Sequence, residues 1–217
     1  MSLSTKNVKE SKVSKTINPG NTVAKINDIT LKKGYNEGSY VLELHVESQP
    51  IQDPSFEGFY IDKDNPSNGR FAGQVGKIRY SQYAYETKTL PSGVKIDRDQ
   101  SILKAILLIS KSLGCLDEVN EVEADTIEEF INKVKPIIIS TGKFMHYCVA
   151  GKAYTNKEGY TAYDLFLPKA AGGKYVMTDS EDSVVTFIEK DHIIAEKKKT
   201  ENVDSFEPKQ SSSDFDF

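Results

Sequence analysis

The sequence predicts a mainly β domain with an α-helical insertion and polar ends that do not fold. Apolar residues alternate with period two in three stretches before residue 86 and in two stretches after residue 142, and between them the period is helical. The 217 residues are 38% hydrophobic and 28% charged, which suffices for a core but is polar for a chain that folds throughout. We therefore expect one folded domain over 22–195 with unfolded flanks.

The segment ahead of this domain, 1–21, is predicted to be a flexible basic arm. It consists mainly of Ser, Thr, Lys and Asn and has few apolar side chains to bury. Four lysines are spaced along it: Lys6, Lys9, Lys12 and Lys15. Such an arm either contacts phosphate or is simply solvated, and its composition favours the solvated alternative.

The domain is expected to begin with a β-hairpin. The stretches 22–31 (TVAKINDITL) and 40–46 (YVLELHV) flank a turn that contains two glycines, and the alternation gives the hairpin one buried face. A short strand is expected at 58–61. The polar segment 62–71 (DKDNPSNGRF) is then expected to be a turn or an exposed loop.

The stretch 73–85 (GQVGKIRYSQYAY) is predicted to be the third strand, and it carries the main functional signal. Because side chains of a strand alternate between its faces, Lys77, Arg79, Tyr83 and Tyr85 share one side. Lys and Arg neutralise phosphates and Tyr rings stack on bases, which are the two requirements of sequence-tolerant single-strand binding. The alternative is an ordinary solvated face, because Tyr is common in strands for packing reasons.

A helical insertion is predicted over 97–136. Asp97 or Asp99 is placed to cap a first helix, and Gly114 is placed to end it. The segment 125–128 (DTIE) has the spacing of a capping box for a second helix, which Pro136 is expected to end. Each helix has one apolar stripe, so we expect both to pack on the sheet and assign them no chemistry.

Strand patterns return after the insertion. The stretches 143–154 and 160–167 flank a glycine-containing loop of hairpin length, and 183–189 is a candidate for one more short strand. The resulting order is that of the five-stranded OB-fold barrel, in which the central strands and loops bind oligonucleotides. We therefore expect an OB-fold barrel with its helical segment between strands 3 and 4. Other α+β folds share this order, and a fold does not by itself define a function.

The last segment, 196–217, is predicted to be a disordered acidic tail. From residue 200 onwards it holds five acidic residues and one lysine, which accounts for the whole net charge of −4. Acidic and aromatic side chains alternate over its tip: Asp214, Phe215, Asp216 and Phe217. Such a tip fits a partner's pocket that pairs a basic residue with an apolar slot, or the chain's own basic groove in place of DNA. The alternative is a tail that only aids solubility.

A barrel of this order with an acidic, Phe-terminated tail resembles the replication-type single-stranded-DNA-binding proteins of bacteria and tailed phages. The resemblance covers the architecture of 22–167 and the tip 214–217, and the phage type is the more similar because the insertion is long and no Gly/Gln-rich linker precedes the tail. It implies coating of exposed strands in DNA replication, recombination and repair, with the tail recruiting a polymerase, helicase-primase or nuclease. It implies a bacterial cytoplasm and leaves open whether the protein is a homo-oligomer.

Two features of the composition bear on location. Cys115 and Cys148 are the only cysteines, too few for a disulfide framework, which favours a reducing, intracellular compartment. No apolar run approaches the length of a membrane span, and the first residues lack the apolar region of a signal peptide. We expect no membrane association.

The motifs of enzymatic chemistry are missing or incomplete. His146 and Cys148 share a strand face and, with Cys115, would supply only part of a zinc site. Lys143 precedes Phe where a phosphate-binding P-loop needs Ser or Thr. The sequence has no H-E-x-x-H, no G-x-S-x-G and no acidic cluster typical of two-metal nucleases. We expect a protein that is not an enzyme and carries no metal or cofactor.

The sequence therefore predicts a single-stranded-DNA-binding protein. The residues expected to face the bound DNA strand are Lys77, Arg79, Tyr83, Tyr85, Tyr60, Arg70, Phe71, Lys152 and Tyr154. Tyr60 and Tyr154 have a core position as their alternative. The runner-up function is a non-catalytic protein-interaction or virion-associated module with an OB-like barrel. A third is an enzyme of nucleic-acid metabolism, against which the missing acidic cluster argues. The preference for DNA over RNA stays open.

Overall fold

The computed structural model describes residues 16–34, 38–50, 73–83, 87–89, 91–93 and 95–196, with the backbone alone at 81–83, 87, 88, 95 and 96. The lysines of the basic arm, the strand expected at 58–61 with its following loop, and the acidic tail from 197 onwards lie outside these residues. The folded part starts earlier than expected, because Ile17 is 4% exposed and its N–H donates to the carbonyl of Val75.

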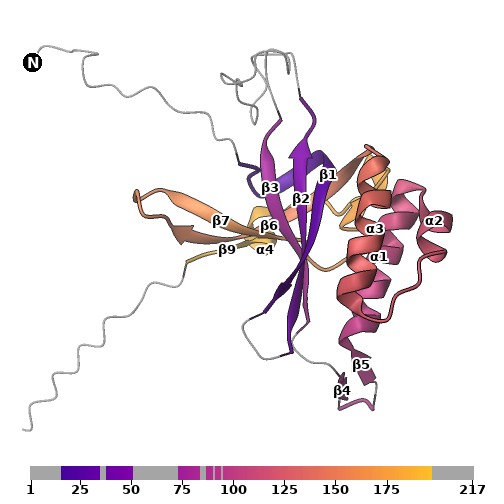
Figure 1. Ribbon diagram of the computed structural model, residues 1–217. Helices are drawn as coiled ribbons and strands as arrows, with labels where there is room; N and C mark the ends of the chain where they lie inside the picture. Colours follow the sequence, from indigo (N-terminus) through magenta and orange to yellow (C-terminus); the bar gives the residue numbers. More distant parts are fainter. Residues whose placement is uncertain are drawn as a thin grey trace, which may run out of the picture.

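Five long strands form a sheet whose two edges meet (Figure 1). They are β1 (Gly20–Lys33), β2 (Tyr40–Ser48), β3 (Val75–Tyr83), β6 (Phe144–Thr155) and β7 (Thr161–Phe166). The first three form an antiparallel meander, β3 pairs in parallel with β7, and β7 pairs antiparallel with β6. Because β6 also pairs antiparallel with β1, the strands close in a ring. The predicted mainly β domain with a helical insertion is confirmed at this level.

The first strand of the ring serves two ladders. Its beginning, 20–25, pairs with β6, whereas 24–33 pairs with β2. The register shifts between Ile26 and Asp28, so the buried side chains are Ala24 and Ile26 before the shift and Ile29 after it. A bulge of this kind bends a strand and resets which residues face inward. It therefore keeps one face of β1 apolar from the first ladder to the second.

The core fills the ring and continues between the ring and the helices. Leu42 and Leu44 of β2 and Ile78 of β3 are 0% exposed, and from β6 the ring of Tyr147 is equally buried. On β3 the side chains next to Ile78, Lys77 and Arg79, are exposed and polar, as the alternation of a half-buried strand requires. Apolar residues of α1 and α3 belong to the same cluster. The sheet and the helices therefore share one core.

Three helices form a layer on one side of the sheet (Figure 1): α1 (Arg98–Leu113), α2 (Leu116–Asn120) and α3 (Ile127–Ser140). The predicted ends of α1 are confirmed, because the side chain of Asp97 accepts from the N–H of Gln100 and Gly114 ends the helix at a φ of 74°.

No helix in the described part of the chain is long and apolar enough to cross a bilayer.

The predicted ends of the other long helix, α3, need two corrections. Its cap is Thr126, one residue later than the expected box, with Thr126 Oγ1 accepting from the N–H of Glu129 and Glu129 Oε2 accepting from the N–H of Asp125. The helix also continues through Pro136 to Ser140. Proline removes one backbone hydrogen bond, but Ile138 beyond it is 1% exposed, and burial of that side chain in the core offsets the loss.

Arg98 connects the helix layer to the start of β2. Its side chain is 8% exposed, Nη1 donates to the carbonyl of Gly38 at 2.7 Å, and the guanidinium lies 4.4 Å from the ring centroid of Tyr40. The hydroxyl of Tyr40 donates in turn to Glu128 of α3. The turn before β2 is thereby held against both long helices.

The remaining elements are short. β4 (Thr87–Thr89) and β5 (Lys95–Asp97) pair with each other, β8 (Met177–Thr178) and β9 (Ile193–Ile194) pair with β6, and a 3₁₀ turn at Glu181–Ser183 and α4 (Glu189–His192) complete the described chain. The strand expected at 183–189 is wrong. Two backbone groups of this segment bond to a side chain in place of a neighbouring strand. The side chain of Asn21 donates to the carbonyl of Val185 and accepts from the N–H of Phe187.

Candidate nucleic-acid interface

The two predicted cations of β3 lie on its outer surface. Lys77 and Arg79 are exposed, and Ile78 between them is 0% exposed, as the alternation of a half-buried strand predicts. In the ladder with β2, Lys77 lies opposite His45 and Arg79 lies opposite Glu43. The polar face of β3 therefore continues onto β2.

The predicted residues of β6 are exposed as well. Lys152 and Tyr154 are two positions apart, and their side chains therefore leave the strand on the same face. Tyr154 is 41% exposed, so the core position that was its alternative is excluded. Lys152 lies opposite Asp164 in the ladder with β7.

The other predicted site residues are not described with side chains. The backbone of Tyr83 ends β3, and its side chain lies outside the described set. Four other predicted residues lie entirely outside the described set: Tyr60, Arg70, Phe71 and Tyr85. The tail tip, which comprises Asp214, Phe215, Asp216 and Phe217, also lies outside it. Those positions stay predictions.

Two clefts gather the described site residues. The first cleft has a volume of about 840 Å³ and is lined by Arg79 and Lys152. The second cleft has a volume of about 600 Å³ and is lined by Lys77, Arg79 and Tyr154. Arg79 and Asp164 line both, so the two clefts meet at this pair of side chains. The ring thus brings together predicted residues from β3 and β6, which are far apart in the sequence.

The first cleft combines positive charge with rings. Its cations come from four different parts of the chain: Arg79 on β3, Lys111 on α1, Lys152 on β6 and Lys169 after β7. Its aromatic residues are Tyr80, Phe166 and Tyr175, and its carboxylates are Asp164 and Asp179. Tyr175 is 56% exposed and thus offers a ring face to a ligand. Cations beside exposed rings can neutralise phosphates and stack on bases.

Sequence reasoning missed two of the four cations of the first cleft and its most exposed ring. Lys111 lies on a helix that was assigned no chemistry, and Lys169 and Tyr175 lie in the loop that follows β7. Their residue types are the expected ones, but nothing in their spacing indicates that α1 and this loop meet β3. The pairing of β3 with β7 creates that proximity, because the carbonyl of Arg79 accepts from the N–H of Leu167 at 2.9 Å.

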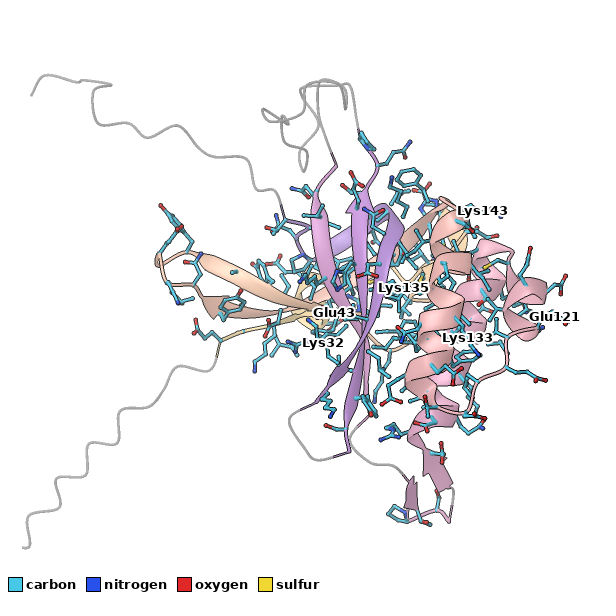
Figure 2. All side chains as sticks on the ribbon, viewed as in Figure 1. Lys32, Glu43, Glu121, Lys133, Lys135 and Lys143 are labelled. Carbon is cyan, nitrogen blue, oxygen red and sulfur yellow. The ribbon has the colours of Figure 1, made fainter. Side chains whose placement is uncertain are left out.

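The second cleft is more nearly balanced in charge. His45, Lys77 and Arg79 are accompanied there by Glu43 and Asp164, and its rings are Tyr154 and Tyr163. Glu43 is 7% exposed and lies 2.6 Å from Lys32 Nζ; Figure 2 shows these two side chains together on the sheet. Burial by itself raises the pKa of Glu43, but the hydrogen bond and charge of Lys32, together with His45, outweigh burial and hold that pKa below its usual value. Glu43 is therefore anionic at neutral pH.

One ion pair lies where the clefts meet. Arg79 Nη2 is 3.8 Å from Asp164 Oδ1, and the two side chains are 51% and 50% exposed. Pairs of this separation and exposure are weak, worth about 0–1 kcal/mol. Arg79 can therefore leave Asp164 for a stronger anionic ligand.

The two cysteines and His146 show no arrangement typical of a reactive site. Both thiols are buried, and burial raises the pKa of each. Within the described ranges, no group of three or more His, Cys, Asp or Glu side chains is placed to hold a metal ion.

The chain was compared with family models, curated proteins and solved structures. No protein-family model, no curated protein and no solved structure matches this chain.

Proposed function

We propose that the ring is an OB-fold barrel and that the protein binds single-stranded DNA along the two clefts. The observation that carries this proposal is the meeting of cations and exposed rings from β3, β6, α1 and the loop after β7. A five-stranded ring with a helical segment between its third and fourth strands supports the barrel assignment.

In this function the cations and the rings have different tasks. Lys77, Lys111 and Lys152 neutralise phosphates, which gives affinity without sequence preference and makes binding depend on salt. Tyr154 and Tyr175, both exposed, stack on bases, and each stacked base contributes about 1–3 kcal/mol. Every base has a π face, so a protein of this kind coats strands of any sequence.

The resemblance of the sequence to replication-type single-stranded-DNA-binding proteins agrees with this mechanism. It extends the proposal to strand coating during replication, recombination and repair, with the acidic tip 214–217 recruiting a polymerase, helicase-primase or nuclease. Binding of the tip to a partner uses its carboxylates and its two rings.

The test is a salt titration of oligo-dT binding with Lys77→Ala/Arg79→Ala. Removing two phosphate-neutralising groups should reduce the slope of log K against log salt by about 1.4, at about 0.7 per phosphate. The matched control is Lys104→Ala/Lys133→Ala, which removes the same charge from residues that line neither cleft. An unchanged slope in the first variant, or an equal change in both, contradicts the assignment of the clefts.

A second candidate function, a protein-interaction module, has one observation in its favour. Leu108 and Ile194 line the first cleft and are 44% and 49% exposed. Exposed apolar side chains are typical of protein interfaces. Titration with single-stranded and duplex oligonucleotides, with magnesium and with EDTA, separates the candidates. Binding of single strands without cleavage supports the first function, no binding supports the second, and cleavage contradicts both.

A further inference from the structure

We infer that Asp164 is an internal competitor for phosphate, which lowers the affinity of the clefts for the DNA strand. This inference rests on the proposed function, because it concerns the same clefts. It assigns a role to a residue that sequence reasoning did not single out.

The position of Asp164 is the first argument. It lies on β7 between two cations, since Lys152 is its partner in the ladder with β6 and Arg79 on the other neighbouring strand is 3.8 Å away. It lines both clefts, as Arg79 does. A DNA strand that runs from one cleft to the other therefore passes this carboxylate.

The charges across the ring form an alternating row. Lys32 on β1 pairs with Glu43 on β2, Glu43 lies opposite Arg79 on β3, and Arg79 pairs with Asp164 on β7. Lys152 on β6 completes the row opposite Asp164. The two carboxylates differ in availability, because Glu43 is 7% exposed and has a 2.6 Å contact with Lys32, whereas the side chain of Asp164 is half exposed. Asp164 is the member of the row that a ligand can replace.

The chemistry of the exchange follows from the ligands. A guanidinium binds a phosphate through two parallel N–H···O bonds, which a carboxylate at 3.8 Å from one nitrogen does not match. Phosphate therefore displaces Asp164 from Arg79, and the displaced carboxylate stays close and repels the same phosphate. Both effects lower affinity, and both disappear when the carboxylate is replaced by a neutral amide.

An opposite role for Asp164 is acceptance of hydrogen bonds from base amino groups. In that case the carboxylate would assist binding of strands that carry such groups, and its loss would weaken their binding. The comparison of oligo-dT, whose bases have no exocyclic amino group, with oligo-dC therefore distinguishes a competitor from a base-reading residue.

The experiment measures affinity and salt slope for oligo-dT and oligo-dC with full-length wild type and Asp164→Asn. The variant should bind both strands several-fold more tightly, because Arg79 then contacts phosphate without a competing carboxylate. Asp117→Asn is the matched control, since Asp117 is exposed on α2 and lines neither cleft. Asp164→Ser provides a second neutral variant if the first does not fold.

A double-mutant cycle with Arg79→Gln isolates the pair. If Asp164 acts by competing for Arg79, part of the tightening caused by Asp164→Asn disappears when Arg79 is already Gln. The inference is overturned if wild type binds and Asp164→Asn binds equally or more weakly, if Asp117→Asn tightens binding as much, or if the cycle shows no coupling. Failure of wild type to bind any single strand instead overturns the proposed function.

Discussion

Two sets of four lysines on this molecule differ in what surrounds them. On the side of β1 and α3, four lysines each pair with a carboxylate: Lys25 with Glu47, Lys32 with Glu43, Lys133 with Glu129 and Lys135 with Asp28. Figure 2 shows Lys133 and Lys135 on α3. In the clefts, Lys77, Lys111, Lys152 and Lys169 form no ion pair with any residue that the structure describes.

The difference teaches that local counter-ions, and not net charge, decide whether a cation is available to a polyanion. The paired lysines, here called the paired set, have already exchanged part of their water for a carboxylate. The cleft lysines, here called the cleft set, keep their charge for a ligand. A chain with a net charge of −4 can therefore present a positive surface in one region.

The largest expected effect comes from removing charge in the two regions separately. In the triple variant Lys111→Ala/Lys152→Ala/Lys169→Ala, the slope of log K against log salt for oligo-dT should be less steep than in wild type by about 2. Between about 50 and 200 mM salt, the affinity of wild type should therefore fall about 20-fold more than that of the variant. The triple variant Lys25→Ala/Lys133→Ala/Lys135→Ala should keep the slope of the wild type. Equal slopes in the two variants would break the comparison.

The second effect concerns stability. Lys32→Ala leaves the buried carboxylate of Glu43 without its closest cation and should cost about 1–2 kcal/mol of unfolding free energy. Lys77→Ala, an exposed member of the cleft set, should stay within about 0.5 kcal/mol. Urea denaturation measures both. A larger loss in the Lys77 variant would mean that the cleft lysines have a structural role.

The same pair gives a dependence on pH. The pKa of Glu43 is below its usual value in the folded state, so the stabilisation is present above the unfolded pKa of about 4.3 and is lost as the pH falls through the lower folded pKa. Without Lys32, burial raises that pKa towards or above the unfolded value, so Lys32→Ala should lose less stability than wild type as the pH falls. Urea midpoints of wild type and Lys32→Ala between about pH 3 and 7 measure the shift.

The smallest expected effect extends the comparison from charges to rings. Tyr175→Ala should weaken oligo-dT binding by about 1 kcal/mol, about fivefold, and Tyr175→Phe should keep the affinity because the ring remains. Because stacking involves no charge, the salt slope should not change. Tyr160 is 63% exposed but lines neither cleft, so Tyr160→Ala should bind as the wild type does. Equal losses at the two tyrosines would remove the distinction between cleft and surface rings.

The elements that sequence reasoning predicted well are those whose signal is local. The alternation of 40–46, the cap at Asp97 and the glycine at Gly114 all depend on neighbours within a few residues, and all are present. The helix through Pro136 was missed because burial of Ile138 in a shared core overrides a local rule.

The candidate site was predictable only along single strands. Lys77 and Arg79, or Lys152 and Tyr154, share a face by alternation, which the sequence contains. Lys111 enters the first cleft from α1, because that helix packs against β3 and β8. Contacts of that kind join residues far apart in the chain, and no periodicity encodes them.

The shared first strand also orders events during synthesis. Gly20 pairs with Val149, so one edge of β1 has no partner until the ribosome has made the chain well beyond the helices. The β1–β2–β3 meander, by contrast, is complete by residue 83. Because chains fold from the N-terminus as they emerge and distant pairings are slow, an open three-stranded sheet should come first. Closing it then completes both clefts in a single late step.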